Sequence, residues 1–98
     1  MYEIRYSNTA QRYFKKTKEK GLKTAFRTAL ERIGDDPYCG TLKIGDLAGI
    51  YCYDVFYNRT NYEIAYRIYE DDDKIVVVIM AGTRENFYEQ LKRYAKNP

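Results

Sequence analysis

Arg84 and Tyr88 are the two side chains in this sequence whose types and spacing best suit a chemical reaction. They lie four residues apart after an apolar run at residues 75–80, so a helix there would place both on one face. An arginine can bind a phosphate through two hydrogen bonds, and a tyrosine can stack on a nucleobase or exchange a proton. The pair therefore suits phosphodiester chemistry. A packed tyrosine beside an arginine paired with Glu85 or Glu89 is the structural alternative.

Several classes of enzyme are excluded by what the chain lacks. With no histidine in 98 residues, neither a Ser-His-Asp triad nor a paired-histidine ribonuclease mechanism is possible. The two cysteines, Cys39 and Cys52, fit no metal-ligand spacing, and no glycine-rich phosphate loop precedes a helix. We therefore expect two free thiols, buried or half-buried, and neither a metal ion nor a small-molecule cofactor. The three aspartates at 71–73 are expected to form a solvated turn.

The charge of the chain is divided along its length. Residues 1–32 carry nine Lys or Arg against three Asp or Glu, residues 33–73 carry three against nine, and the remainder carries five against two. A basic segment of this kind attracts a polyanion such as RNA, although a solvated helix face rich in lysine has the same composition. Lys15, Lys16 and Lys23 are the candidates for contacts with an RNA backbone.

The length and composition predict a single domain over residues 1–98. A chain of 98 residues is long enough for one hydrophobic core but not for two. Its 45% hydrophobic and 32% charged residues are typical of a globular protein. No apolar run approaches the roughly 18 residues that span a bilayer, and the N-terminus has no signal-peptide pattern. We therefore expect a cytoplasmic protein that does not contact a membrane.

The N-terminal third of the chain predicts a strand and two helices. Residues 2–6 alternate in character, as a strand does. Ser7 or Asn8 can cap a first helix, which runs up to Gly21 and ends there through a left-handed glycine. A second helix is predicted over residues 22–34 from an apolar stripe at helical spacing. The stripe consists of Leu22, Ala25, Phe26, Ala29, Leu30 and Ile33.

The rest of the chain predicts three strands and a last helix. After an Asp-Asp-Pro stop at residues 35–37 and a loop, residues 50–57 and 62–69 alternate and are joined by a turn, which indicates a hairpin. Residues 75–80 are mostly β-branched, as in the middle strand of a sheet, and residues 85–95 have helical spacing. The order β-α-α-β-β-β-α predicts an α+β fold: a small, twisted antiparallel sheet with two N-terminal helices on one face and a short C-terminal helix.

Tyrosines are more numerous in this chain than a small core requires, since there are twelve. A phenol ring can serve either as a core residue or as a platform on which a base stacks. Tyr51, Tyr53 and Tyr66 alternate onto the expected core face of the hairpin. Tyr88 and Tyr94, near the C-terminus, are the two that we expect RNA to reach.

The order of elements and three sequence segments resemble the RelE/ParE superfamily of bacterial toxins. The segments are YEIAYRI at residues 62–68, IVVVIM at 75–80 and GTRENFY at 82–88, and the resemblance covers nearly the whole chain. It implies the toxin of a type II toxin-antitoxin pair, held inactive by a cognate antitoxin protein. RelE-like members cut mRNA in the ribosomal A site, whereas ParE-like members inhibit DNA gyrase.

The arginine and tyrosine near the C-terminus favour the RelE-like branch. The resemblance then implies a ribosome-dependent, metal-independent mRNA endoribonuclease, with the ribosome and mRNA as further partners. In such an enzyme the 2′-hydroxyl attacks the adjacent phosphate and the 5′-oxygen leaves. By resemblance, Arg84 takes the place of the arginine that stabilises the phosphate, and Tyr88 that of the C-terminal tyrosine that stacks on or positions the base.

The sequence departs from the RelE-like pattern on the two middle strands. Where that pattern has basic residues, this chain has Asp54, Phe56 and Glu63, which do not stabilise a developing negative charge. Arg67, on the same strand face as Glu63, or Arg59, in the preceding turn, could supply a displaced cation. Asp54 or Glu63 could be the general base for the 2′-hydroxyl. Alternatively, these acids and arginines pair only structurally.

Two other functions remain open on the sequence alone. A ParE-like inhibitor that binds DNA gyrase needs no catalytic residues, so the missing cations would not affect it. A catalytically degenerate toxin fold would bind its antitoxin without being toxic. Substitution of Arg84 discriminates the first from an endoribonuclease, because a gyrase inhibitor would keep its toxicity.

Overall fold

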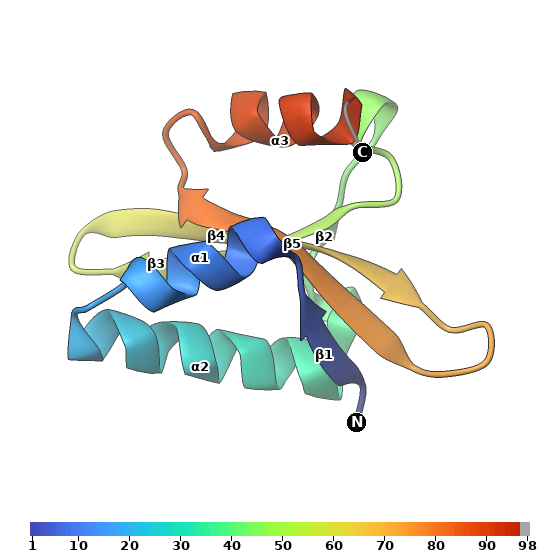
Figure 1. Ribbon diagram of the computed structural model, residues 1–98, viewed down its shortest axis with the longest axis horizontal. Coiled ribbons are helices and arrows are strands. Elements are labelled where there is room, and N and C mark those ends of the chain that lie inside the picture. Colours follow the sequence, from blue (N-terminus) through green and yellow to red (C-terminus); the bar gives the residue numbers. More distant parts are fainter. Residues whose placement is uncertain (97–98) are drawn as a thin grey trace.

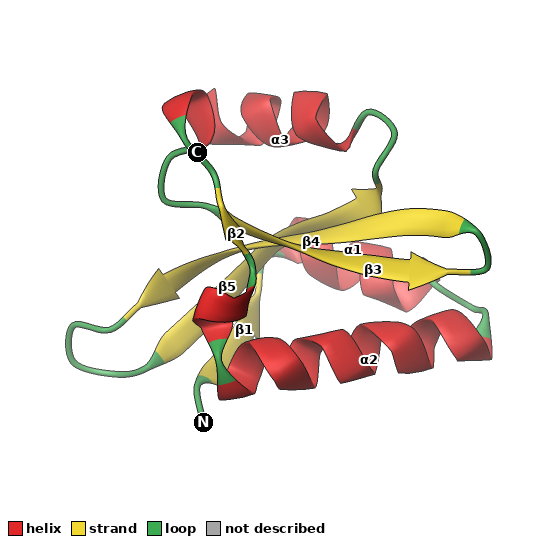
Figure 2. Ribbon diagram, turned by 180° about the vertical axis from the view of Figure 1, so that it is seen from behind, coloured by secondary structure: helices red, strands yellow, loops and turns green. Residues whose placement is uncertain are grey.

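The computed structural model describes residues 1–96, which form one sheet with helices on both faces (Figure 1). The strands are β1 (Glu3–Tyr6), β2 (Thr41–Leu42), β3 (Tyr51–Tyr57), β4 (Thr60–Tyr69) and β5 (Ile75–Thr83). The helices are α1 (Asn8–Lys16), α2 (Lys20–Asp35) and α3 (Phe87–Lys96), with short 3₁₀ turns at Pro37–Cys39 and Gly45–Leu47. Helices α1 and α2 cover one face of the sheet and α3 lies over the other (Figure 2). None of the helices within residues 1–96 is long and apolar enough to cross a membrane.

The predicted α+β class and order of elements are confirmed, with the two-residue β2 as an addition. The spatial order is β1-β5-β4-β3-β2, and the pairs β5-β4, β4-β3 and β3-β2 are antiparallel. The sheet is thus mostly antiparallel, as predicted, and the parallel pairing of β1 with β5 at one edge is an addition to that prediction. β4, rather than β5, is the middle strand. Alternation along one segment indicates a strand but does not indicate its neighbour, which here lies far along the chain.

The start of α1 follows the predicted capping, whereas its end does not. The Ser7 hydroxyl accepts a hydrogen bond from the Ala10 amide at 3.0 Å and donates one to the Ile79 carbonyl at 2.8 Å, which joins the helix to β5. α1 ends at Lys16 rather than at about Lys20. Gly21 instead lies inside α2, where a Cβ atom would collide with the Tyr57 hydroxyl, so close packing explains this glycine.

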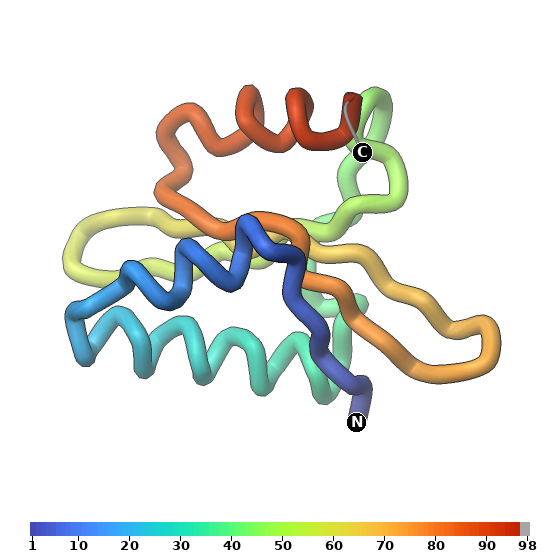
Figure 3. The backbone as a smooth tube through the Cα atoms, in the orientation of Figure 1, coloured from blue at the N-terminus to red at the C-terminus, as the bar shows by residue number. Residues whose placement is uncertain are grey.

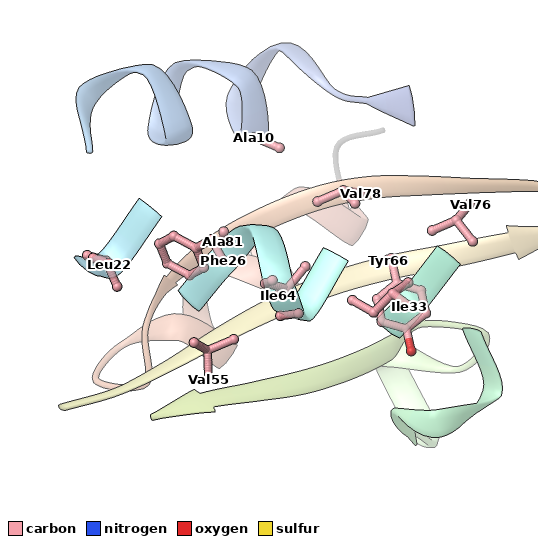
Figure 4. Packing of buried hydrophobic residues seen from close by; sticks show 11 residues of the cluster. Ala10, Leu22, Phe26, Ile33, Val55, Ile64, Tyr66, Val76, Val78 and Ala81 are labelled. Atoms are coloured by element: carbon pink, nitrogen blue, oxygen red, sulfur yellow. The ribbon is translucent and has the colours of Figure 1, made fainter. Parts of the chain in front are cut away.

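A cluster of apolar residues fills the space between the sheet and helices α1 and α2, and we call it the helix-side cluster (Figure 4). The predicted stripe of α2 supplies Leu22, Phe26, Ala29 and Ile33, which are buried, and Ala25 and Leu30, which are partly buried. The sheet supplies Val55, Ile64, Tyr66, Val76, Val78 and Ala81. Burial of such side chains contributes about 1.5–3 kcal/mol each to folding. The helix-side cluster is therefore the main core.

Tyr66 anchors the segment that the sequence predicted only as a loop. Its side chain is fully buried, and its hydroxyl donates a hydrogen bond to the Pro37 carbonyl at 2.6 Å. Tyr51 and Tyr53 pack against the same cluster, so the expected core positions of these three tyrosines are confirmed. Both thiols are free and Cys52 is buried, but Cys39 is exposed, so the expectation of a covered thiol was wrong there.

A second apolar cluster lies under α3, and we call it the α3-side cluster. It consists of Leu47, Ile50, Cys52, Ala65, Ile79, Met80, Phe87 and Leu91. β3, β4 and β5 therefore carry apolar residues on both faces, which is why their alternation is interrupted at positions such as Ala65. A β-bulge between Ala65 and Tyr66 shifts the register of β4 against β5.

The turn between β3 and β4 projects beyond the start of α3 (Figure 3). Its central residues, Asn58 and Arg59, have φ angles of 50° and 64°, which is the type I′ geometry of a two-residue hairpin. Asparagine adopts the left-handed region readily, but for arginine this backbone conformation costs about 1 kcal/mol or more. Glycine is the residue that this turn position favours.

Substitution of Arg59 tests this description of the turn. Arg59→Gly is expected to raise the free energy of unfolding by about 1 kcal/mol, because glycine adopts a positive φ without steric strain. Urea titration of the two proteins measures the difference. Asn58→Gly is the matched control, with a smaller gain. An Arg59→Gly variant that is less stable than the original chain would show that the turn is not strained.

Candidate functional site

The carboxyl group of Glu63 is the centre of the most unusual polar cluster in the described residues. Its side chain is 1% exposed, although it belongs to a strand face that also carries exposed residues. The Tyr88 hydroxyl donates a hydrogen bond to Oε1 at 2.9 Å. Oε2 is buried without a hydrogen-bond partner, and the Arg84 Nε lies 3.9 Å from it. A buried acid with a free oxygen requires an explanation, because burial without a hydrogen bond is unfavourable.

Pairing within the sheet places two of the predicted residues beside Glu63. In the β-ladders Glu63 lies opposite Asp54 on β3 and opposite Gly82 on β5. Asp54 is exposed, and Gly82 has no side chain that would fill the space over the acid. Arg84 follows the end of β5, and its backbone N–H donates to the Asn61 carbonyl at 2.9 Å. These pairings fix the positions of Asp54, Glu63 and Arg84 relative to one another.

Arg84 and Tyr88 meet at Glu63 and not on a shared helix face. Helix α3 begins at Phe87, later than predicted, and Arg84 lies in the turn before it. Asn86, with a φ of 65°, redirects the chain into the helix. The expected pairing of Arg84 and Tyr88 on one helix face was therefore wrong. The alternative of an ion pair between Arg84 and Glu85 or Glu89 was also wrong, because the carboxyl group near Arg84 is that of Glu63. The Arg84 side chain is 58% exposed, so its guanidinium remains accessible to a ligand.

Lys43 is the member of this cluster that sequence reasoning missed. It lies between β2 and the 3₁₀ turn Gly45–Leu47, and its Nζ is 4.7 Å from the centre of the Tyr88 ring. Its backbone N–H donates to the Ile50 carbonyl at 2.9 Å, which fixes the loop. Lys43 is one of only three cations in the acidic stretch 33–73, and that was the available signal. We call Lys43, Asp54, Glu63, Arg84 and Tyr88 the Glu63 site.

In the Glu63 site, burial opposes the charged form of the acid, whereas the surroundings of Lys43 favour the charged form of the lysine. Burial raises the pKa of Glu63, and Asp54 raises it further, while the Tyr88 hydrogen bond and the Lys43 charge act in the opposite direction. Burial also raises the pKa of Tyr88. The contact with Tyr88 raises the pKa of Lys43, so the lysine keeps its charge at neutral pH. Arg84 and Asp54 are exposed, Lys43 is half-buried and Glu63 is buried, so a ligand would meet the first three side chains.

Other predicted residues lie away from the Glu63 site. Arg67 is half-buried and four residues along β4 from Glu63, which is about 13 Å on a strand, and its side chain lies near Gly49. Arg59 lies at the tip of the β3–β4 turn. Tyr94 is half-buried against the α3-side cluster. The structure therefore does not bring Arg67 to the Glu63 site.

The basic residues of the N-terminal helices lie on the opposite face of the sheet. Lys15 and Lys16 are exposed in the last turn of α1, and Lys23 is exposed on α2. An open groove of about 780 Å³ lies between β1, α1 and α2. Its lining includes Ile4, Phe14, Phe26 and Leu30 together with Lys15, Lys23 and Arg27. The structure thus has two separate candidate surfaces, one on each face of the sheet.

The Glu63 site has the components of phosphoryl-transfer chemistry. An exposed guanidinium can bind the oxygens of a phosphate, and an exposed carboxylate can accept a proton from a hydroxyl. Lys43 adds a second positive charge. Glu63, buried between these groups, holds the Tyr88 hydroxyl and faces the Arg84 side chain.

Glu63→Gln tests the charge state of the buried acid. Because the folded-state pKa is raised, Glu63 favours folding below its unfolded pKa and this contribution is lost as the pH rises through the folded pKa. Stability of the original chain is therefore expected to fall relative to Glu63→Gln as the pH increases from about 4. Chemical denaturation at several pH values measures this. Glu89→Gln, at an exposed position of α3, is the control. Parallel pH profiles for the original chain and Glu63→Gln would contradict a raised pKa.

Solved structures with the same fold include toxins of toxin-antitoxin pairs. A mutant of the Escherichia coli toxin RelE in the free state superimposes with a TM-score of 0.74 at 15% identity, covering 99% of this chain and 98% of that chain. A RelBE2 toxin-antitoxin complex from Mycobacterium tuberculosis superimposes with a TM-score of 0.65 at 26% identity, covering 85% of this chain and 98% of that chain. The intact RelBE toxin-antitoxin complex from E. coli superimposes with a TM-score of 0.65 at 18% identity, covering 84% of this chain and 95% of that chain.

The family of the chain is given by its sequence. A comparison with curated protein sequences gave no significant match. The family model described as ParE-like toxin of type II bacterial toxin-antitoxin system matches residues 4–92, which is most of the chain and includes every residue of the Glu63 site. The chain therefore belongs to the ParE-like toxins of type II bacterial toxin-antitoxin systems, and its fold is that of RelE.

Proposed function

We propose that this toxin is a ribosome-dependent, metal-independent mRNA endoribonuclease that inhibits translation. The observation that carries the proposal is the exposed Arg84 guanidinium, held at the end of β5 beside the cross-strand pair Asp54 and Glu63. The RelE-like fold supports the choice of substrate. A toxin of this kind would act in the cytoplasm, where ribosomes and mRNA are found.

Asp54 is the general base in this proposal, and Arg84 stabilises the phosphate. Asp54 removes the proton of the 2′-hydroxyl, and the 2′-oxygen attacks the adjacent phosphorus. A 2′,3′-cyclic phosphate forms as the bond to the 5′-oxygen breaks, and the 5′-oxygen takes a proton from water. Arg84 binds the phosphoryl oxygens, where negative charge develops. Asp54 suits the role of base better than Glu63, because Asp54 is exposed and Glu63 is 1% exposed.

Lys43 supplies part of the positive charge that the middle strands lack. It is charged at neutral pH, and its ammonium group lies over Tyr88, next to Glu63. Arg67 lies too far along β4 to take this role. Lys43 and Arg84 would then act on the phosphate in place of the larger set of basic residues in the RelE-like pattern.

Glu63 and Tyr88 position these groups. The Tyr88 hydroxyl donates a hydrogen bond to Glu63, and Lys43 lies over the Tyr88 ring. The Phe87 ring packs edge-to-face against the same ring, with 5.7 Å between the ring centres. A tyrosine held in this way fixes α3 against the sheet and orients Lys43. The resemblance implies a tyrosine that stacks on or positions the base, and we propose instead that Tyr88 positions α3 and Lys43.

A cognate antitoxin is the proposed protein partner. Two of the similar structures are complexes of a toxin with its antitoxin, and a third is the RelE mutant bound to a peptide of the antitoxin RelB. The groove between β1, α1 and α2 has an apolar lining with Lys15, Lys23 and Arg27 beside it. A helical segment with apolar and acidic side chains would fit such a groove.

Inhibition of DNA gyrase is the second candidate function. The observation that favours it is the replacement of basic residues by Asp54, Phe56 and Glu63, together with the ParE-like description of the family. A gyrase inhibitor requires a binding surface and no catalytic residues. Toxicity that persists in the presence of intact mRNA would therefore favour this function, and no toxicity at all would indicate a degenerate toxin.

Substitutions at Arg84 and Asp54 test the endoribonuclease. Arg84→Ala is expected to reduce cleavage about 100-fold or more and to abolish growth arrest, because a transition-state hydrogen bond is lost. Asp54→Asn should reduce cleavage by about 100-fold or more as well, since the amide cannot accept the proton. Arg12→Ala, an exposed arginine on α1, is the matched control and should arrest growth normally.

The readouts are growth after induction without antitoxin and the single-turnover rate of mRNA cleavage on ribosomes. Thermal unfolding of each purified variant checks that the fold is retained. Normal arrest and normal cleavage by a folded Arg84→Ala protein would overturn the proposed mechanism.

A further inference from the structure

Phe56 is exposed on the open part of the sheet face that carries the Glu63 site. All four phenylalanines of the chain lie in the described part, and three of them pack in the two apolar clusters. Phe56 belongs to neither cluster and is 68% exposed. It shares a strand face with Cys52 and Asp54, because alternate residues of β3 point the same way. Cys52 is covered by α3, Asp54 is exposed, and Phe56 lies furthest towards the turn.

Phe56 is close to the groups that would act on the phosphate. Two residues along a strand is about 7 Å, so its ring lies roughly that far from the proposed base Asp54. Its cross-strand partner is Asn61, and the Asn61 carbonyl accepts the backbone hydrogen bond of Arg84. A nucleobase on the Phe56 ring would thus lie within one nucleotide of both catalytic side chains.

Base stacking is a task for which Tyr88 is poorly placed in this chain. Its ring is half-buried, with Lys43 over it and Phe87 against it. A base requires a free aromatic face, and each base stacked on such a face contributes about 1–3 kcal/mol to binding. Phe56 offers a free face on the same side of the sheet. An exposed aromatic ring thus occupies a position at which the family pattern has a cation.

The strained turn that follows Phe56 also supports RNA binding at this end of the hairpin. Arg59 occupies a left-handed position at which glycine would be more stable. An arginine held there at a cost in stability presents a cation at the tip of the hairpin, three residues along the chain from Phe56. Phosphates that follow a stacked base would meet this cation.

We propose that Phe56 is the platform on which a base of the mRNA stacks beside the cleaved bond, with Arg59 binding the RNA backbone next to it. This inference rests on the proposed endoribonuclease function. Single-stranded RNA, presented in the decoding site of the ribosome, is the ligand class. The hairpin β3–β4 is thus a substrate-binding arm as well as a structural element.

Fluorescence of a base analogue on the ribosome tests this assignment. Ribosomes are programmed with mRNA that carries 2-aminopurine in the A-site codon and a 2′-deoxy sugar at the cleaved bond, so that the RNA stays intact. The original protein is expected to quench the fluorescence. Phe56→Ala should abolish the quenching and raise the half-saturating protein concentration, measured by co-sedimentation with the programmed ribosomes, roughly 5- to 100-fold, as the loss of one stacked base implies. Phe56→Trp should retain both.

Tyr69→Ala, an exposed aromatic residue at the other end of β4, is the matched control and should behave as the original chain. Equal quenching and equal half-saturation by Phe56→Ala, with ribosomal cleavage of normal mRNA intact, would overturn the assignment of Phe56 alone. A protein that fails to co-sediment with programmed ribosomes in any form would reject the endoribonuclease and this inference together.

Discussion

The buried carboxyl of Glu63 is the group around which the α3 face of this toxin is organised. The middle strand of a sheet with apolar residues on both faces is an unfavourable place for an acid, because burial opposes the charged form. Glu63 is stabilised there by the hydrogen bond from Tyr88 and by the nearby charge of Lys43. These contacts join the middle strand, the start of α3 and the loop before β3. A single acid thus connects three segments that are distant in sequence.

The position of Glu63 also explains why the open polar surface lies where it does. Phe87 and Leu91 of α3 pack on the α3-side cluster and cover the part of the sheet that contains Cys52 and Ala65. The sheet continues beyond the start of this helix towards the β3–β4 turn (Figure 1). Asp54 lies at that transition, and Arg84 enters it from the end of β5. The covered part gives rigidity, and the uncovered part is free for a ligand.

Local sequence patterns predicted most of the fold. The apolar stripe of α2, the alternation of β3 and β4 and the Ser7 cap are local signals, and each corresponds to an observed element. The parallel pairing of β1 with β5 and the short β2 depend on contacts between distant segments, for which no local signal exists. Gly21 illustrates the same limit, because its role is set by the Tyr57 side chain on another element.

Most residues of the Glu63 site could be named from the sequence, but their arrangement could not. Arg84, Tyr88, Asp54 and Glu63 follow from residue types and from the resemblance to the superfamily, but the family pattern treats Glu63 as a missing cation. Only the structure shows it as a buried acid that holds Tyr88. Lys43 lies in a loop without periodicity, so its approach to Tyr88 depends on how that loop folds over the sheet. In the sequence, Phe56 is only a departure from the family pattern, whereas its exposure in the structure favours the proposed role in base stacking.

The most direct test of the endoribonuclease is to identify the RNA ends that the purified toxin generates. Capped mRNA is incubated with the toxin in a reconstituted translation reaction, with and without ribosomes, and the ends are mapped by primer extension and mass spectrometry. Cuts at the A-site codon that require ribosomes and leave a 2′,3′-cyclic phosphate and a 5′-hydroxyl are the result expected of the proposed endoribonuclease. Intact mRNA in every reaction, with a preparation that arrests growth in cells, would contradict it and direct attention to a protein target.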